Sequence, residues 1–213
     1  MHLEILTRAQ ITVLEGLTRL AVAADFYLAG GTALALRHGH RRSIDFDFFR
    51  PDTFDGFALR TAVENLPGAI EWMPSGAHTL HLRINQVDLS FFKYPYPLLA
   101  PPQSTPWGFG IASDLDIAAM KLEAIAGRGS RKDFVDLRLL CAAGLGLETV
   151  FTLSEQKYGT HRTDRYHRLR ALAFFDDAEQ QPMPYMLVPH DWEETKAYFT
   201  AEARRLLAAG LAS

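Results

Sequence analysis

The sequence contains one cysteine and no long apolar run. Cys141 is the only cysteine among 213 residues, so an internal disulfide is impossible and a reducing compartment is expected. No stretch approaches the roughly 18 apolar residues that a membrane-spanning helix needs, and residues 1–10 lack the basic and apolar regions of a signal peptide. These absences exclude a disulfide-stapled scaffold and predict a cytoplasmic protein with no membrane partner.

A strong excess of one charge is also missing. The formal net charge is −3 and the sequence pI is about 6.2, which argues against a protein that coats nucleic acid non-specifically. The chain has no internal repeat and no low-complexity tract. Apolar residues make up 48% of it, which is enough for a core in one large domain or two small ones.

The most informative stretch is residues 30–49. It begins with Gly30, Gly31 and Thr32, continues through a basic segment, and ends in an apolar run that contains Asp45 and Asp47. If residues 44–49 form a strand, the two aspartates share one face and the apolar side chains share the other. Like charges on one face repel each other, and a cation between them relieves the repulsion. Mg²⁺ is the natural cation, because it binds one or two carboxylates together with substrate phosphates.

The glycine pair supplies the complementary half of such a site. Glycines that precede a helix present backbone N–H groups with no side chain in the way, and helix N-termini attract phosphates. A glycine turn followed by metal-binding carboxylates therefore predicts a nucleoside triphosphate site. The basic segment between them, residues 37–42, is either a solvated loop or a contact to triphosphate or RNA, and the sequence leaves both open.

A third carboxylate lies on a later predicted strand. Three strand-like runs cover residues 69–73, 79–84 and 86–92, with Asn85 suited to a tight hairpin between the last two. Asp88 has apolar neighbours on both sides, so it points to the opposite face from them. Taken alone it is an ordinary half-exposed aspartate, but beside the upstream pair it would complete a metal site.

The proline-rich segment 95–106 marks a change in pattern. Its five prolines predict a linker or wrapped arm, and we place a domain boundary here, with residues 1–100 before it and 101–213 after it. The second part reads as mainly helical, and the whole as an α+β fold with a small mixed sheet flanked by helices. Within the helices, Lys121 lies off the apolar stripe, and Asp133 and Asp136 share one helix face.

One later segment is strongly basic. Residues 161–170 contain four arginines, two histidines and one aspartate. A helix face of this kind is most often simply solvated, and in a nucleotide enzyme it is also the first place to look for an RNA-binding surface.

Three segments together resemble a known family. They are Gly-Gly-Thr followed after twelve residues by Asp-Phe-Asp, the strand aspartate Asp88, and the segment 116–137 with its Lys-Asp-x-x-Asp-Leu pattern. This combination is similar to the AbiEii/AbiGii-type nucleotidyltransferases, a branch of the DNA polymerase β-like superfamily in which many members act as toxins. The resemblance covers nearly the whole chain and implies a nucleotidyltransferase core followed by a helical part that contributes to the cleft.

The resemblance also implies roles for individual residues. Asp45, Asp47 and Asp88 would be the metal ligands, for two Mg²⁺ ions, and NTP would be the substrate. The predicted catalytic residues are Asp88, Lys121 and Asp133, and the pattern leaves open whether Asp133 or Asp136 is the active-site acid. The residues expected at the nucleotide share backbone or side-chain donors: Gly30, Gly31, Thr32, Arg42, Ser43 and Lys121.

The predicted reaction transfers a nucleoside monophosphate from an NTP to an acceptor hydroxyl, which the family's toxins suggest is RNA, at the tRNA 3′ end. A cognate antitoxin would be a protein partner. Three alternatives stay open: transfer to a protein or small molecule, a non-catalytic nucleotide-binding partner protein, and a purely structural edge strand at 45–49 blunted by charges. The sequence contains no base-recognition pattern that identifies the NTP.

Overall fold

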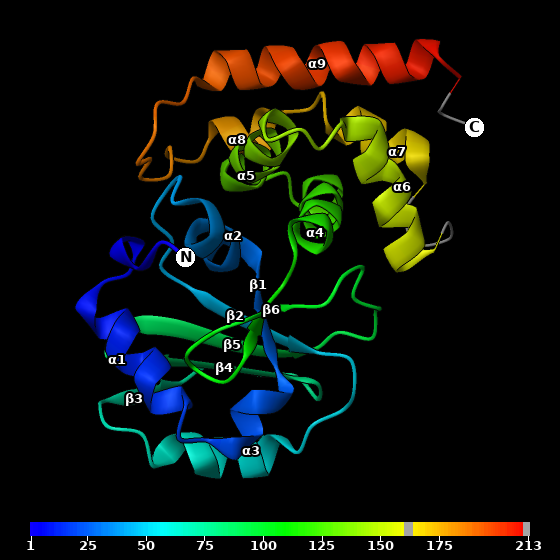
Figure 1. Ribbon diagram of the computed structural model, residues 1–213. Coiled ribbons are helices and arrows are strands. Elements are labelled where there is room, and N and C mark those ends of the chain that lie inside the picture. Colours follow the sequence, from blue (N-terminus) through cyan, green and yellow to red (C-terminus); the bar gives the residue numbers. More distant parts are fainter. Residues whose placement is uncertain (160–163, 211–213) are drawn as a thin grey trace. The chain divides into compact units, whose positions relative to one another are not determined.

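The computed structural model describes residues 1–159 and 164–210. It divides into two compact units, Met1–Ser113 and Asp114–Ser213 (Figure 1). The first unit contains the sheet and the second is helical, so the predicted α+β fold is confirmed. No helix among the residues described here combines the length and the apolarity that crossing a membrane requires.

The first unit is built on one mixed sheet of seven strands. Their order is β3-β4-β5-β2-β1-β7-β6. The strand bounds are β1 Tyr27–Ala29, β2 Phe46–Arg50, β3 Ile70–Trp72, β4 Thr79–Ile84, β5 Val87–Lys93, β6 Gln103–Ser104 and β7 Gly110–Ile111. The helical segments of this unit are the 3-10 helices Leu3–Ile5 and Ala21–Asp25 and the α-helices α1 Arg8–Leu17, α2 Gly30–His38 and α3 Gly56–Glu64.

Strand β2 lies at the centre of the sheet. It pairs antiparallel with β1 and parallel with β5, and the register puts Phe46 beside Leu89. Because the strands run parallel, the residues just before this pair, Asp45 and Asp88, come to the same end of neighbouring strands. Side chains alternate along β2, with Phe46 and Phe48 buried and Asp47 partly exposed.

Aromatic side chains pack together and hold the central strands of the sheet in place. The Phe48 ring stacks on Phe91 with centroids 5.2 Å apart and meets Phe109 edge-on at 5.0 Å. Phe26 contacts Phe91 edge-on at 5.2 Å. These rings come from four separate segments, so burying them together ties the short strands into one sheet.

The turn between β4 and β5 lies where the sequence predicts a tight hairpin. Asn85 and Gln86 are the two loop residues and both have positive φ, which is the backbone of a type I′ turn. Asn85 also accepts a hydrogen bond from the Ala69 amide through its side chain, at 3.2 Å. The predicted tight connection at Asn85 is confirmed.

The proline-rich segment differs from its prediction. Part of it forms β6, which pairs with β7, and β7 in turn pairs in parallel with β1. The first unit therefore extends past the expected boundary at residue 100 and ends at Ser113. Proline lacks an N–H donor but is compatible with a sheet edge, and β6 is the edge strand of this sheet.

One predicted strand bound also shifts. Strand β2 begins at Phe46 rather than at residue 44, so Ile44 is 70% exposed instead of packing with the phenylalanines. Helix α1 ends at Leu17 and a separate 3-10 helix follows it. Helix α3 begins after Asp55, whose side chain accepts the amides of Phe57 and Ala58.

The second unit consists of helices around an aromatic cluster. Its helices are α4 Asp114–Gly127, α5 Arg131–Ala142, α6 Leu147–Tyr158, α7 Arg165–Ala171, α8 Asp176–Glu179 and α9 Trp192–Ala208. Phe134 of α5 contacts Phe175, Trp192 and Phe199, with centroid distances of 5.1, 6.0 and 5.6 Å. The cluster packs α9 against the start of α5.

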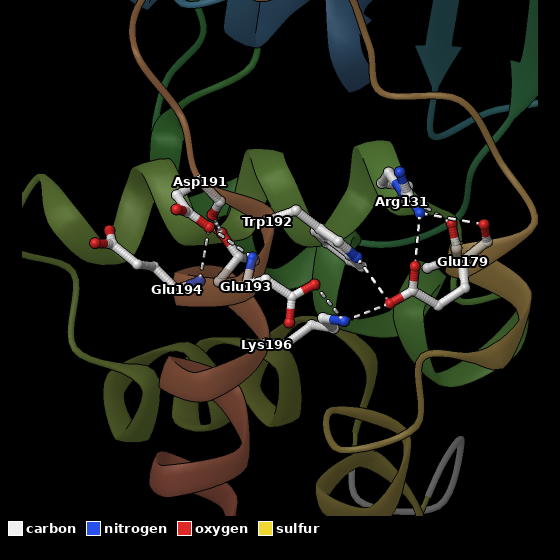
Figure 2. A network of polar contacts seen from close by, with 9 residues as sticks. Arg131, Glu179, Asp191, Trp192, Glu193, Glu194 and Lys196 are labelled. Atoms are coloured by element: carbon white, nitrogen blue, oxygen red, sulfur yellow. Dashed lines mark hydrogen bonds and ion pairs between the residues drawn. The ribbon is translucent and has the colours of Figure 1, made fainter.

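A polar network reinforces the same junction (Figure 2). Glu179 accepts hydrogen bonds from Arg131 at 2.9 Å, from the Trp192 indole at 3.0 Å and from Lys196 at 2.5 Å. The guanidinium of Arg131 also lies over the Trp192 ring, 4.9 Å from its centroid. Asp191 caps α9, because its side chain accepts the backbone amides of Glu193 and Glu194. The network fixes the first turn of α5, which carries Asp133.

Candidate active site

The glycine pair lies where two charged side chains approach the backbone. Gly30 begins α2 with φ +72°, and a Cβ there would lie 3.0 Å from the Asp47 carboxylate. A Cβ on Gly31 would overlap the Arg41 guanidinium. Both positions therefore need glycine, because Asp47 and Arg41 occupy the space that a side chain would fill.

The N-terminus of α2 has the properties expected of an anion site. Its N-cap residue is Ala29, whose side chain has no oxygen to accept the amides of the first turn. The helix dipole adds partial positive charge at this end. Ala29 pairs with Asp47 across strands β1 and β2, so a carboxylate and a helix N-terminus meet at the same point.

Thr32 is used inside the protein. Its side chain is buried, with 1% of its surface exposed, and its hydroxyl donates a hydrogen bond to the Asp45 carbonyl. The sequence prediction assigned this hydroxyl to a phosphate. The structure instead gives it the function of holding the backbone of Asp45 against α2.

The basic segment separates into buried and exposed parts. Arg41 is only 2% exposed, and its guanidinium donates to the Arg42 carbonyl at 2.9 Å beside Gly31. Arg42 is exposed and Ser43 partly exposed. The Ser43 carbonyl accepts from Gln10, and its hydroxyl lies near the space above Gly31. The sequence analysis passed over Arg41, because nothing in a run of basic residues distinguishes the one that folds inward.

The three predicted metal carboxylates occupy one end of neighbouring strands but differ in their surroundings. Asp45 and Asp47 are partly exposed. Asp88 forms a two-pronged ion pair with Arg83, with distances of 2.6 and 3.1 Å. The hydrogen bonds that Arg83 donates to Asp88, and then the charge of that carboxylate, raise the pKa of Arg83, and the charges of Glu71 and Asp45 raise it further.

Asp45 and Asp47 form the part of this set that fits a Mg²⁺ ion. Mg²⁺ needs only one or two carboxylates when phosphates complete its shell, and the Asp47 carboxylate lies directly at the α2 N-terminus. Within residues 1–159 and 164–210, however, no three His, Cys, Asp or Glu side chains are grouped as a ready-made metal cage. Asp88 could join the pair only after leaving Arg83.

The second unit buries its own charged cluster. The Lys121 ammonium on α4 lies 2.8 Å from Asp133 and 2.7 Å from Asp136, both on α5. Lys121 is 4% exposed and both carboxylates are completely buried. The predicted common face of Asp133 and Asp136 is confirmed, and Lys121, predicted off the apolar stripe of its helix, turns inward between them.

Asp133 has two further partners. The Ser130 hydroxyl and the Arg128 guanidinium both donate to its carboxylate, the latter at 3.0 Å. Burial by itself would raise the pKa of Asp133, but the charges of Lys121 and Arg128 outweigh it and lower the pKa to about 2. Asp133 is therefore a stable anion and, in this arrangement, a poor proton acceptor.

The same unit contains two other buried ion pairs that the sequence analysis did not identify. Asp116 accepts from Lys157 at 2.7 Å with neither side chain exposed, and Glu123 accepts from Arg168 at 2.6 Å. Arg168 belongs to the basic segment predicted as a surface, and it is 1% exposed. Residues 161–163 of that segment lie outside the described residues. The helical spacing of α4 alone could not indicate which charged residues turn inward.

Comparison with solved structures shows a shared fold. The structure is similar to MenT4, a nucleotidyltransferase toxin of Mycobacterium tuberculosis, with a TM-score of 0.57 and 17% sequence identity, over 93% of this chain and 84% of that one. It is also similar to JHP933 of Helicobacter pylori, with a TM-score of 0.52 and 17% identity, over 95% of this chain and 90% of that one.

Comparison of sequences gives the family. The chain is 38% identical over 206 residues to the uncharacterized protein aq_aa25 of Aquifex aeolicus, which covers 95% of this chain and 98% of that protein. Residues 12–209 match the family of nucleotidyl transferase AbiEii toxins of type IV toxin–antitoxin systems. The resemblance that the sequence motifs carry is thereby confirmed: the chain belongs to the AbiEii family and is a nucleotidyltransferase.

Proposed function

We propose that this nucleotidyltransferase moves an NMP from an NTP to a hydroxyl of RNA, in a Mg²⁺-dependent reaction, as a toxin restrained by a cognate antitoxin. One observation carries the proposal. The partly exposed carboxylates Asp45 and Asp47 lie beside the α2 N-terminus, where Gly30 and Gly31 carry no side chain and the charged groups of Asp47 and Arg41 approach the backbone.

The triphosphate would bind at that helix N-terminus. The amides of Gly31 and the residues after it would donate to phosphate oxygens, and the helix dipole would favour the negative charge. Arg41 lies buried beside Gly31 and would add a fixed positive charge to this region. Arg42 and Ser43 border the same turn and are proposed as further nucleotide contacts.

Asp45 and Asp47 would hold the metal. Bound Mg²⁺ would neutralise phosphate charge and make the acceptor hydroxyl easier to deprotonate. Thr32, which bonds the Asp45 backbone, would keep the two carboxylates at a constant distance from the glycine turn. Holding reactants in one geometry is the main contribution that a protein makes to phosphoryl chemistry.

In the transfer step the acceptor oxygen forms a bond to the α-phosphorus. The bond between that phosphorus and the bridging oxygen of the β-phosphate breaks, and pyrophosphate leaves. The hydroxyl proton would pass to Asp88, which must first exchange its Arg83 partner for the acceptor. Arg83 would then be free to contact phosphate, so one charged pair would serve two steps.

Lys121 and Asp133 are proposed to act from the second unit. Lys121 forms ion pairs with two buried carboxylates, so contact with a phosphate would require it to release one of them. The low pKa of Asp133 argues against a role as general base. We therefore assign Asp133 to positioning Lys121 and Arg128, and leave Asp136 as the second partner that orients the lysine.

The direct test is transfer of label from each of the four α-labelled NTPs. Wild-type protein would be incubated with total RNA, with tRNA, and separately with lysate proteins, with and without EDTA. Label in RNA that disappears with EDTA and in Asp45→Asn or Asp47→Asn, but persists in the exposed control Asp52→Asn, would support the proposal. Label in protein, or label that survives Asp47→Asn, would contradict it.

The toxin role needs a cellular experiment. Induced expression should arrest growth, and Asp47→Asn should abolish the arrest at equal protein level. Arrest by both forms would favour the alternative of a non-catalytic partner protein.

A further inference from the structure

The second unit contains a pocket that the proposed chemistry does not use. It has a volume of about 680 Å³ and lies between the C-terminal end of α4, helix α7 and helix α9. This volume falls within the roughly 300–1,000 Å³ of pockets that hold drug-sized ligands. All of its lining residues belong to the second unit, so its shape does not depend on the first.

The floor of the pocket is apolar and its edge is aromatic. Ile125, Leu169 and Ala203 are buried beneath it, while Leu207 is partly uncovered. Phe174 is 54% exposed, although a phenylalanine ring would gain from burial. A flat ring held at the mouth of an apolar pocket offers a stacking surface to a ligand.

The rim of the pocket is positively charged. Arg128, Arg170 and Arg204 line it, against Asp177 as its one carboxylate. Among the described residues, Arg204 has no hydrogen-bond or ion-pair partner, and Arg170 contacts only the Tyr166 ring. The contrast with Arg168, which is buried on Glu123, is informative. The buried cations of this unit, such as Arg168, are paired with carboxylates. Within the part of the chain that the structure describes, Arg170 and Arg204 at the pocket have no carboxylate partner.

We propose that this pocket binds a nucleotide of single-stranded RNA, with the base on Phe174 and the phosphates at Arg170 and Arg204. The proposal rests on the proposed function, in which RNA is the acceptor. Proteins that bind single strands combine such a cationic edge with an aromatic stacking surface. An acidic peptide would satisfy the arginines equally well, but its carboxylates would leave the apolar floor unfilled.

Arg128 connects the pocket to the ion cluster. Its side chain lines the pocket, is 64% exposed, and bonds the buried Asp133 carboxylate at 3.0 Å. An RNA phosphate at the pocket would compete with Asp133 for this guanidinium. Bound RNA would then be felt at Lys121, which shares Asp133.

The test measures RNA binding without catalysis. A fluorescein-labelled single-stranded RNA of twelve nucleotides is titrated with full-length protein in EDTA without NTP, and Kd is read from polarisation at several salt concentrations. Arg204→Gln is compared with Arg205→Gln, the neighbouring arginine that bonds Glu202 outside the pocket. Phe174→Ala is compared with Phe57→Ala, an exposed phenylalanine of the first unit.

We expect Arg204→Gln to weaken binding several-fold and to reduce the slope of log K against log salt by about 0.7, the value for one phosphate of a single strand. Phe174→Ala should weaken binding by about tenfold at unchanged slope, as loss of one stacked base predicts. The two controls should bind like wild type. Equal binding by all four variants, no RNA binding by wild type, or Arg204-dependent binding of a polyglutamate peptide instead of RNA would overturn the proposal.

The same variants separate this proposal from the proposed function. If wild type labels RNA but the pocket variants keep its RNA affinity, the pocket assignment alone fails. If the pocket variants lose RNA affinity but wild type labels no RNA, the pocket stands and the reaction assignment fails.

Discussion

Asp45 and Asp47 in the first unit are partly exposed at the start of a central strand, whereas Asp133 and Asp136 in the second unit have no exposed surface. The buried pair is compensated by Lys121, whose ammonium lies within 2.8 Å of both carboxylates. The exposed pair faces a helix N-terminus and a glycine turn, where water or a ligand can reach it.

The difference follows from the cost of burying charge. A carboxylate that leaves water must gain a cation and hydrogen bonds from the protein itself, or the fold loses stability. A partly exposed carboxylate keeps part of its hydration and needs less compensation from the protein. The same residue type is therefore fully buried on a lysine in the second unit and partly exposed in the first.

The largest effect should come from removing charge at the open pair. We expect Asp47→Asn to reduce NMP transfer by about a thousandfold or more, since metal and phosphate would lose a ligand together. Its free energy of unfolding should change by less than about 1 kcal/mol, because Asp47 is partly exposed and asparagine keeps its shape. Labelled transfer and urea unfolding measure the two quantities. A large loss of stability would mean that Asp47 is structural and would remove the contrast between the units.

Removing the cation of the buried cluster should instead cause a large loss of stability. Lys121→Met leaves two buried carboxylates short of a partner, which is expected to cost about 3–5 kcal/mol of stability. Lys196→Met is the matched control, because Lys196 also bridges two carboxylates but at the surface. It should lose far less. If the two variants unfold at similar urea concentrations, the buried cluster does not stabilise the second unit as described.

The buried cluster should also make stability depend on pH in acid. The pKa of Asp133 is lowered from its ordinary 3.8 to about 2. A lowered folded-state pKa gives stability that is complete above pH 4 and is lost as the pH falls toward 2, here by about 2 kcal/mol. The free energy of unfolding should fall by that much more in wild type than in Asp133→Asn over this interval. Parallel curves for the two proteins would contradict the assignment.

The smallest predicted effect concerns the ion pair at the edge of the open site. Arg83→Gln removes the cation that competes for Asp88. If Asp88 serves the reaction, half-maximal transfer should then need a few-fold less Mg²⁺, with the free energy of unfolding changed by less than about 1 kcal/mol because the Arg83 and Asp88 side chains are 43% and 31% exposed. Arg60→Gln, which breaks the Arg60–Glu64 pair on α3, is the control. An unchanged Mg²⁺ requirement in Arg83→Gln would remove Asp88 from the metal set.

Features that depend on local periodicity could be predicted from the sequence. Strand alternation gave the burial of Phe46 and Phe48 on either side of the partly exposed Asp47, the turn residue Asn85 gave the β4–β5 hairpin, and helical spacing gave the common face of Asp133 and Asp136. Each depends on neighbours within four residues.

Features that depend on which side chain turns inward could not be predicted. Arg41 and Arg42 are adjacent and chemically identical, yet one is buried against Gly31 and the other is exposed. Lys121 was predicted off the apolar stripe of its helix, and the packing of α5 beside α4 brings two carboxylates to it. Tertiary packing decides these positions, and a single sequence carries no direct record of it.

Binding of NTP tests the central claim most directly. Calorimetric titration of wild type with a non-hydrolysable NTP analogue, with Mg²⁺ and then with EDTA, should give binding that weakens by at least about tenfold without the metal. The Mg²⁺-dependent part should vanish in Asp47→Asn and persist in Asp136→Asn. Equal affinity with and without Mg²⁺, or full Mg²⁺ dependence in Asp47→Asn, would contradict the assignment of the open carboxylate pair as the metal site.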